Sequence, residues 1–418
     1  MRTSSRRTAV AVAAACLTLA AHAGVTAAAA PAGGTGDTRA IYAVPGTDVQ
    51  ERTAINRTGA LVLSVSGGEA VVEATPEQAE RMRAAGLAPQ RRTSVAAELA
   101  RRGQGAPGDF PPEDRGYHNY DEVVAELGAA VADHPDIATL TSAGTSHEGR
   151  DIPVLKISDN AGQDEAEPEV LFDCNQHARE HLTTEMCLRI VERFTDGYAT
   201  DPAIAEMVDS RELWVIPVVN PDGSIHDVAS GQYLGWRKNR QGPGTDLNRN
   251  WGHKWGCCGG SSGDPNAETY RGTEAWSAPE TAALRDFIDS RVVGGEQQIE
   301  AAIDFHTYSE LVLWPFGYTT DQVTEGMTQE QYDRFERVGT EMARTNGYTP
   351  QQASGLYITD GGSLDWMWAE HGILAFTFEM YPAEGGGLEG FYPPDEVIAE
   401  ETARNDEAVD VLIREAGV

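Results

Sequence analysis

Val170-Leu171-Phe172-Asp173-Cys174-Asn175-Gln176-His177-Ala178-Arg179-Glu180-His181 is a strongly apolar run that ends in a polar turn. The apolar part shows no regular alternation, which is typical of a strand buried on both faces. Similar runs recur with helix-length segments between them, at Ile152 to Ile157, Leu213 to Val219, Ala301 to Phe305 and Leu374 to Phe378. Ser277-Ala278-Pro279-Glu280 matches a capping box at the start of one helix. The pattern predicts a single large α/β domain over residues 109–418, with a mostly parallel or mixed central sheet flanked by helices.

The first thirty residues have the features of a secretory signal peptide. Three arginines precede an apolar run over 9–21, and Ala21-His22-Ala23 offers a cleavage point, with a site near Ala30 as the alternative. The run is shorter than the roughly 20 residues that span a bilayer. We therefore expect residues 1–30 to be removed and the protein to be secreted and extracellular, without membrane attachment.

A small unit precedes the large domain. Residues 41–87 contain two apolar segments around a Gly67-Gly68 turn, and Thr75-Pro76 then marks a helix start. The following basic stretch, 90–112, carries Gly and Pro and predicts an exposed linker open to proteolysis. In an exported protein this layout predicts a small α+β pro-domain with its linker over residues 31–108; an ordinary accessory domain is the alternative.

Charge and cysteine content restrict the function further. The formal net charge of −33 argues against a nucleic-acid binder, because binding phosphates requires clustered Lys and Arg. It also favours a soluble, self-repelling surface, and we expect a monomer. Four cysteines follow the signal peptide, Cys174, Cys187, Cys257 and Cys258, and they permit three disulfide pairings. The neighbours Cys257 and Cys258 could pair with each other or with the other two.

Polar side chains that follow two of the predicted strands form a candidate metal site. His177 and Glu180 lie in the turn after one strand, and His306 ends another. In open α/β sheets, ligands bind beyond the carboxyl ends of the strands. Two histidines and one carboxylate leave the fourth zinc position open, as in catalytic sites. Asp246 is the favoured partner for the second ring nitrogen of a histidine ligand, and Asp304 is a less favoured one.

Five segments spread over the large domain carry a more specific resemblance. In their order along the chain they resemble the zinc metallocarboxypeptidases of the digestive carboxypeptidase A and B type, and they are His177-Ala178-Arg179-Glu180, Asp246-Leu247-Asn248-Arg249-Asn250-Trp251, Asp304-Phe305-His306-Thr307-Tyr308-Ser309, Gly361-Gly362-Ser363-Leu364-Asp365-Trp366 and Phe376-Thr377-Phe378-Glu379. The match runs from about residue 116 to the end of the chain, and five ordered motifs are very unlikely to arise together by chance. The chain thus resembles a bacterial secreted member of that family.

The resemblance implies a reaction and its central residues. One zinc ion per chain would sit on His177, Glu180 and His306. Glu379 would be the general acid/base that takes a proton from water and returns it to the leaving amine. Arg237 matches the arginine that stabilises the oxyanion of the tetrahedral intermediate. The expected activity is hydrolysis of the C-terminal peptide bond of peptides and proteins.

The resemblance also implies residues that bind the substrate. Asn248 and Arg249 match the pair that binds the free C-terminal carboxylate, for which a planar guanidinium is well suited. Tyr357 matches a mobile tyrosine that closes over that carboxylate. Arg179 matches a further substrate-binding arginine.

Two residues bear on the choice of C-terminal side chain. Leu364 falls where the family places its selector, which implies a preference for apolar or aromatic residues. Asp360, four positions earlier, could accept a basic side chain and give mixed specificity, or it could point away and only shape the turn before Gly361-Gly362. Both readings remain open at the level of the sequence.

Three other functions compete with this hypothesis. An inactive relative could bind peptides or glycans on the same fold, although Glu379, Arg237 and Tyr357 argue against it. A zinc amidase acting on cell-wall peptides could share the metal ligands without needing Asn248 and Arg249. A non-enzymatic adhesion or structural protein would hold no tightly bound metal.

Overall fold

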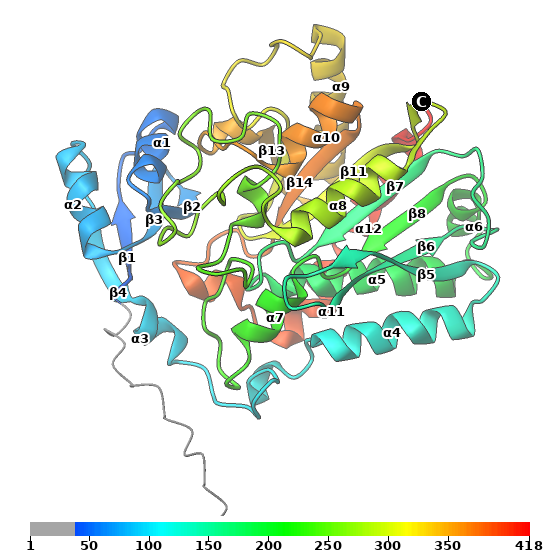
Figure 1. Ribbon diagram of the computed structural model, residues 1–418, viewed down its shortest axis with the longest axis horizontal. Helices are drawn as coiled ribbons and strands as arrows, with labels where there is room; N and C mark the ends of the chain where they lie inside the picture. The colour runs from blue at the N-terminus through cyan, green and yellow to red at the C-terminus, as the bar shows by residue number, and fades with distance from the viewer. Residues whose placement is uncertain (1–37) are drawn as a thin grey trace, which may run out of the picture. The chain divides into compact units, whose positions relative to one another are not determined.

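An eight-stranded mixed sheet organises the larger part of the protein (Figure 1). The computed structural model describes residues 38–418, so the expected signal peptide lies outside the described residues. The strand order is β13-β12-β14-β11-β7-β8-β6-β5. The strands are β5 (Ala138–Thr145), β6 (Asp151–Ile157), β7 (Glu169–Cys174), β8 (Glu212–Ile216), β11 (Ile299–Thr307), β12 (Leu311–Trp314), β13 (Thr349–Gln352) and β14 (Leu374–Met380). The four central strands β14, β11, β7 and β8 are parallel, while β6 and β12 run antiparallel to their neighbours β8 and β14. The predicted mixed α/β sheet is confirmed.

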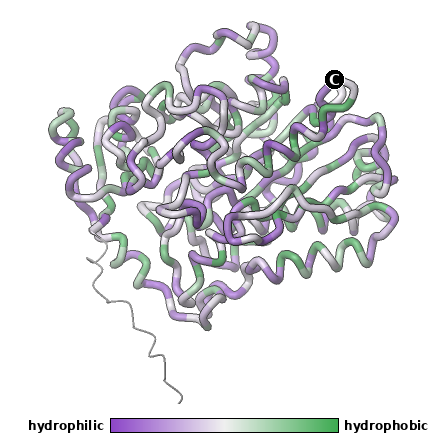
Figure 2. The backbone as a smooth tube through the Cα atoms, in the orientation of Figure 1, coloured by the Kyte–Doolittle hydropathy of each residue, from purple (hydrophilic) through white to green (hydrophobic). Residues whose placement is uncertain are grey.

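Helices cover both faces of this sheet. They are α4 (Tyr120–Asp133), α5 (His181–Gly197), α6 (Pro202–Val208), α7 (Pro221–Asp227), α8 (Pro279–Ser290), α9 (Gln329–Asn346), α10 (Ser363–His371), α11 (Ile398–Ala403) and α12 (Asp406–Glu415). Because successive strand residues face opposite sides, Val170 and Phe172 of β7 join the core under α4, α5, α9 and α12, whereas Leu171 joins the core under α8 and α10. Hydrophobic and hydrophilic stretches alternate along α4, as expected for a helix packed on one side only (Figure 2).

A smaller sheet forms the N-terminal subdomain, residues 40–99. Its four strands are antiparallel in the order β2-β3-β1-β4. Its elements are β1 (Ala40–Val44), α1 (Val49–Arg57), β2 (Leu61–Ser66), β3 (Glu69–Ala74), α2 (Pro76–Ala84), β4 (Gln90–Ser94) and α3 (Val95–Leu99). Thr75 caps α2 as predicted. The expected linker 90–112 is wrong over residues 90–99, because residues 90–94 complete the sheet by pairing with β1 and residues 95–99 form α3.

The start of α8 also differs from the prediction. The N-cap residue is Ala278, and no side chain caps this helix. The Glu280 carboxylate accepts hydrogen bonds from the backbone N–H of His147 and the side chain of Asn239 instead. Tertiary partners therefore outcompete the local capping box.

Two disulfides use the four described cysteines. Cys174, the last residue of β7, pairs with Cys187 of α5, and Cys257 pairs with its neighbour Cys258. Within residues 38–418, no helix combines the length and apolar character needed to cross a membrane.

Candidate active site

The turn after β7 brings two of the predicted metal ligands together. Asn175 adopts a left-handed conformation (φ 57°), which Asn tolerates better than most residues. Its backbone N–H donates to Thr183 of α5 (3.0 Å), and its side chain donates to the carbonyl of His177 (3.3 Å). The chain turns sharply enough that both His177 and Glu180 face the carboxyl end of β11.

Three ligand atoms converge on one point. His177 Nδ1 lies 2.9 Å from Glu180 Oε1, and His306 Nδ1 lies 2.9 Å from Glu180 Oε2 and 3.0 Å from His177 Nδ1. Zinc bonds to histidine nitrogen and carboxylate oxygen are about 2.0–2.2 Å long, so such a triangle fits one tetrahedral ion with an open position. Burial opposes ionisation of Glu180, but the charges of the two histidines outweigh it and hold the pKa of Glu180 well below its usual value.

Each histidine also has a carboxylate at its second ring nitrogen. His177 Nε2 lies 3.0 Å from Asp246 Oδ1, and His306 Nε2 lies 3.0 Å from Asp304 Oδ2. The sequence favoured Asp246 over Asp304, whereas the structure places both carboxylates at the same distance from a histidine ring nitrogen. Such partners fix the orientation and the tautomer of a metal-binding imidazole.

Glu379 and Arg237 border the same point. Glu379 of β14 is in register with His306 of β11, and burial raises the pKa of Glu379 to about 8. Arg237 donates from Nε and Nη2 to Asp246 Oδ2 (3.1 and 3.0 Å), and its Nη1 lies 3.8 Å from Glu180 Oε1. Both groups line a single cleft together with the metal triad.

The residues expected to bind the substrate carboxylate line the same cleft. The Asn248 side chain is 3.2 Å from His306 Nε2 and accepts a hydrogen bond from the backbone of Ser363 (3.0 Å). Arg249 donates to the carbonyl of Gly260 (3.2 Å) and to that of Asn248 (2.6 Å). Tyr357 lines the cleft as well.

Apolar side chains also line the cleft. Leu313, Ala353 and Leu364 line it together with Asp365, a residue that sequence analysis did not select. The Asp365 carboxylate accepts hydrogen bonds from the backbone N–H groups of Gly317 (2.8 and 3.0 Å) and Tyr318 (3.1 Å). Burial raises the pKa of Asp365 to about 6. Its place next to Leu364 in the Gly-Gly-Ser-Leu-Asp-Trp segment was the available sequence signal.

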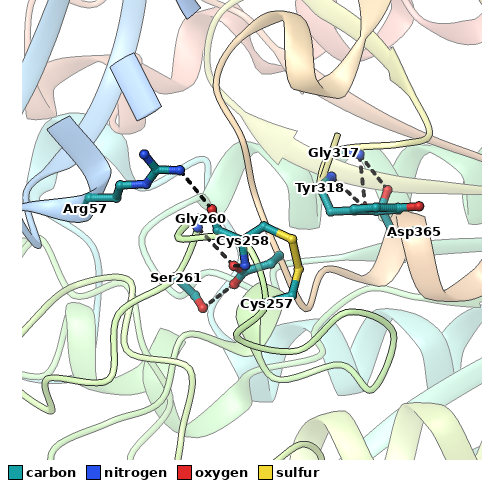
Figure 3. Close-up of a disulfide and its surroundings, with 9 residues drawn as sticks. Arg57, Cys257, Cys258, Gly260, Ser261, Gly317, Tyr318 and Asp365 are labelled. Carbon is teal, nitrogen blue, oxygen red and sulfur yellow. Dashed lines mark hydrogen bonds between the residues drawn. A yellow bond between two sulfur atoms is a disulfide. The ribbon is translucent and has the colours of Figure 1, made fainter. Parts of the chain in front are cut away.

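Asp360 belongs to a supporting loop. Its carboxylate accepts hydrogen bonds from the backbone N–H groups of Cys258 (2.8 Å) and Gly260 (3.0 Å) and from the Ser261 hydroxyl. Figure 3 shows the Cys257–Cys258 disulfide, which joins two adjacent residues of this loop next to Gly260 and Ser261. Asp360 is buried and is not among the residues that line the cleft. Of the two readings left open by the sequence, these contacts favour the one in which Asp360 shapes the turn.

That turn depends on a glycine. Gly361 has φ 67°, and a Cβ atom at this position would lie 2.6 Å from the carbonyl oxygen of Arg249. The backbone N–H of Trp251 donates to the Gly361 carbonyl (2.9 Å). Only glycine allows the Asp246–Trp251 segment and the 359–364 segment to approach this closely.

The N-terminal subdomain contacts the cleft at several of these residues. Leu61, Val62 and Leu63 of β2 line it. Arg52 of α1 donates to the carbonyls of Leu356 (2.6 Å) and Gly355 (3.1 Å), and Tyr357 packs against the subdomain core. Glu73 of β3 lies 3.2 Å from Arg179 Nη1, and both side chains are almost fully buried.

Comparison with known proteins agrees with this geometry. Residues 123–408 match the family model described as zinc carboxypeptidase. The chain belongs to the zinc carboxypeptidase family. A zinc carboxypeptidase from Saccharothrix mutabilis subsp. capreolus is 47% identical, over 90% of this chain and 88% of the relative. Carboxypeptidase A1 from Rattus norvegicus is 32% identical, over 68% of this chain and 67% of the relative.

A solved structure shares the fold of this chain. The carboxypeptidase A from Helicoverpa armigera superimposes with a TM-score of 0.73, covering 90% of this chain and 97% of that chain at 24% identity. As a zinc carboxypeptidase, the protein is a metallohydrolase that uses zinc and acts on the C-termini of peptides. The triangle of His177, Glu180 and His306 fits that metal, both in its ligand types and in its spacing.

Proposed function

We propose that this zinc carboxypeptidase is a secreted proenzyme that removes apolar or aromatic C-terminal residues, with zinc on His177, Glu180 and His306 and with Glu379 as the general acid/base. The observation that carries the proposal is the convergence of the metal triangle, Glu379 and an apolar pocket in one cleft. Bound zinc would supply Lewis-acid polarisation of the scissile carbonyl and a lowered pKa for water.

The chain's own residues would divide the remaining work. Glu379 takes a proton from the attacking water and delivers it to the leaving amine nitrogen. Its buried carboxyl has a raised pKa, which suits a group that must both accept and donate a proton near neutral pH. Arg237 donates to the developing oxyanion, and its pairing with Asp246 holds the guanidinium in place.

The substrate's last residue would be recognised at two points. Arg249 and Asn248 bind the free carboxylate, and Tyr357 closes over it. Leu364 and its apolar neighbours receive the side chain. We propose a preference for Phe and Leu over Lys and Arg, because the Asp360 carboxylate is already bonded to its own loop.

The N-terminal subdomain would act as the pro-domain, with residues 109–418 as the mature enzyme. Its β2 strand lines the cleft, and its Glu73 pairs with Arg179, which we propose as a substrate-binding residue. Residues 103–108 are mostly exposed and lie between the two parts, so we propose that proteolysis there releases the pro-domain. Secretion would follow from the N-terminal signal, and the mature enzyme would be a monomer.

The first test measures metal content together with substrate preference. The cleaved protein is analysed for zinc and assayed on blocked dipeptides ending in Phe, Leu, Lys or Arg, with and without a chelator. We expect one zinc per chain, chelator-sensitive release, and faster release of Phe and Leu. Equal or faster release of Lys would contradict the proposed specificity.

A second test separates this function from its rivals. Glu379→Gln is nearly isosteric and should retain zinc while losing most of the activity, since the amide cannot accept the proton. Activity on cell-wall peptides without release from simple dipeptides would favour an amidase. Bound zinc with no hydrolysis of any substrate would favour an inactive binding protein.

A further inference from the structure

Ser363 lies beneath the proposed active site and contacts two parts of it. It is the first residue of α10, directly before Leu364. It is fully buried, at 0% exposure, and it is not one of the described residues that line the cleft. Any influence of Ser363 on the reaction would therefore have to act through its neighbours.

The Ser363 hydroxyl donates to the carboxylate beside His306. Ser363 Oγ lies 2.7 Å from Asp304 Oδ2, and His306 Nε2 lies 3.0 Å from the same oxygen. The Gln176 side chain donates to this oxygen as well (2.7 Å). Among residues 38–418, the other oxygen of the Asp304 carboxylate has no hydrogen-bond partner. A buried carboxylate depends on such donors, so the hydroxyl is one of the few groups that hold Asp304 in place.

The backbone of Ser363 orients a second residue of the site. Its N–H donates to Asn248 Oδ1 (3.0 Å). Because a backbone N–H can only donate, this contact fixes the Asn248 amide with its oxygen toward α10 and its NH2 group toward His306. As a metal ligand through Nδ1, His306 would carry its proton on Nε2 and donate it to Asp304. The Asn248 NH2 group, 3.2 Å from that Nε2, then finds no acceptor there and keeps its hydrogens for a carboxylate in the cleft.

We propose that Ser363 is a positioning residue for the zinc ligand His306 and for the carboxylate binder Asn248. Its hydroxyl holds Asp304 in the position that orients the His306 ring, and its N–H holds the Asn248 amide. The inference rests on the proposed function, because it takes His306 as a metal ligand and Asn248 as a substrate contact. It assigns two separable contributions to one residue, one to metal binding and one to substrate binding.

Ser363→Ala tests the hydroxyl, because it keeps the N–H. Zinc affinity is measured on the full chain by competition with a chromophoric chelator. We expect Ser363→Ala to bind zinc about three- to tenfold more weakly, since one hydrogen bond to a buried carboxylate is lost. The KM of the zinc-saturated, cleaved protein for a blocked dipeptide ending in Phe should stay unchanged.

Ser146→Ala is the matched control. Ser146 is buried, and its hydroxyl likewise donates to a carboxylate oxygen, Asp222 Oδ1, at 2.7 Å. Neither residue lines the cleft. The control should lower the melting temperature without changing zinc affinity, which is what a merely structural role of Ser363 would also give.

Ser363→Pro tests the N–H, which proline lacks. Proline suits the first position of a helix, and Gly362 before it has an extended backbone (φ −90°, ψ 158°) that tolerates a following proline. Relative to Ser363→Ala, this variant should raise KM about three- to tenfold with zinc affinity unchanged. In an Asp304→Ala background, Ser363→Ala should cost little further zinc affinity, because the hydroxyl acts through Asp304.

The outcomes separate this inference from the proposed function. If His306→Ala binds zinc as tightly as the unmodified protein, the proposed metal site is wrong and this inference fails with it. If His306→Ala loses zinc but Ser363→Ala binds zinc as tightly as Ser146→Ala, this inference alone is overturned. Equal KM values for Ser363→Pro and Ser363→Ala would overturn the role of the N–H. Should Ser363→Ala not fold, Ser363→Cys replaces it, because a thiol is a weak donor, and undiminished zinc affinity in that variant would overturn the role of the hydroxyl.

Discussion

Replacing Glu73 by Gln should activate the uncleaved protein. Arg179 is fully buried, and its Nη1 has two acceptors, Glu73 Oε2 (3.2 Å) and the carbonyl of Gly235 (3.3 Å). Its guanidinium also lies 4.0 Å from the centre of the Phe391 ring in a cation–π contact. The Gln variant therefore leaves a buried guanidinium without its counter-charge while the subdomain covers it. Once the subdomain departs, water can solvate Arg179 in both proteins.

The size of the effect follows from the difference between the docked state, in which Arg179 is buried, and the open state, in which water solvates it. Removing one partner of a buried ion pair costs about 3–5 kcal/mol. The Glu73–Arg179 pair should contribute less than this, because its atoms are 3.2 Å apart. Glu73 also pairs with Arg39 at 2.6 Å, so part of the cost of losing its charge does not involve Arg179. We take about 2–3 kcal/mol as the loss in docking free energy. Because every 1.4 kcal/mol is tenfold, the open fraction should rise by roughly 30- to 140-fold.

The assay compares hydrolysis of a blocked dipeptide ending in Phe by intact and cleaved proteins. Intact Glu73→Gln should be far more active than the intact unmodified protein, and the two should be equal after cleavage. Glu69→Gln is the matched control, because Glu69 lies on the same strand as Glu73. Glu69 forms an exposed ion pair with Arg92 of β4, and such surface pairs contribute little to stability. If folded Glu73→Gln is no more active before cleavage than Glu69→Gln, Glu73 does not hold the subdomain over the cleft.

Three further predictions concern specificity, pH and the loop disulfide. Leu364→Asp should lower kcat/KM for C-terminal Phe by at least about tenfold and raise it for Arg, because a charged side chain replaces apolar contact in the pocket; Leu364→Asn, which should not favour Arg, is the control. The His118 pKa is raised by its hydrogen bond to a carboxylate of α5, so the extra stability relative to His118→Gln should be complete below about pH 6.5. It should disappear as the pH rises through the raised value, and a gap in melting temperature that is constant with pH would contradict this. Cys257→Ser/Cys258→Ser should raise KM several-fold with little change in kcat, since the loop supports Arg249; an unchanged KM would show that the loop holds its shape without the disulfide.

The metal triangle could be predicted because strand ends are readable in a sequence. His177 and His306 each follow an apolar run, and parallel strands present their carboxyl ends at one edge. The position of Asp304 was harder to predict. Alternation placed it on the same side as His306, but the 3.0 Å contact depends on how the ring turns, which only packing decides.

Other expectations failed where distant partners replaced local ones. Glu280 does not take part in the predicted capping box, because its carboxylate accepts hydrogen bonds from the Asn239 side chain and the His147 backbone. Residues 90–94 are exposed and partly basic, yet they form a strand because their backbone pairs with β1 at the edge of the small sheet. The role of Asp360 depended on a loop about one hundred residues earlier in the chain. No local pattern contains these long-range contacts.

The arrangement of the proposed catalytic groups on strands has a consequence for engineering. His306 and Glu379 occupy paired positions on β11 and β14, and backbone hydrogen bonds keep such strands about 4.8 Å apart. Several cleft residues that we propose to contact the substrate's last residue, among them Tyr357 and Leu364, lie within residues 353–364, outside the sheet. A combinatorial library confined to that segment, with Ser363 left unchanged, could diversify selectivity while the hydrolytic apparatus stays constant. Zinc affinity, measured across such a library, should vary far less than the ratio of Phe to Arg release.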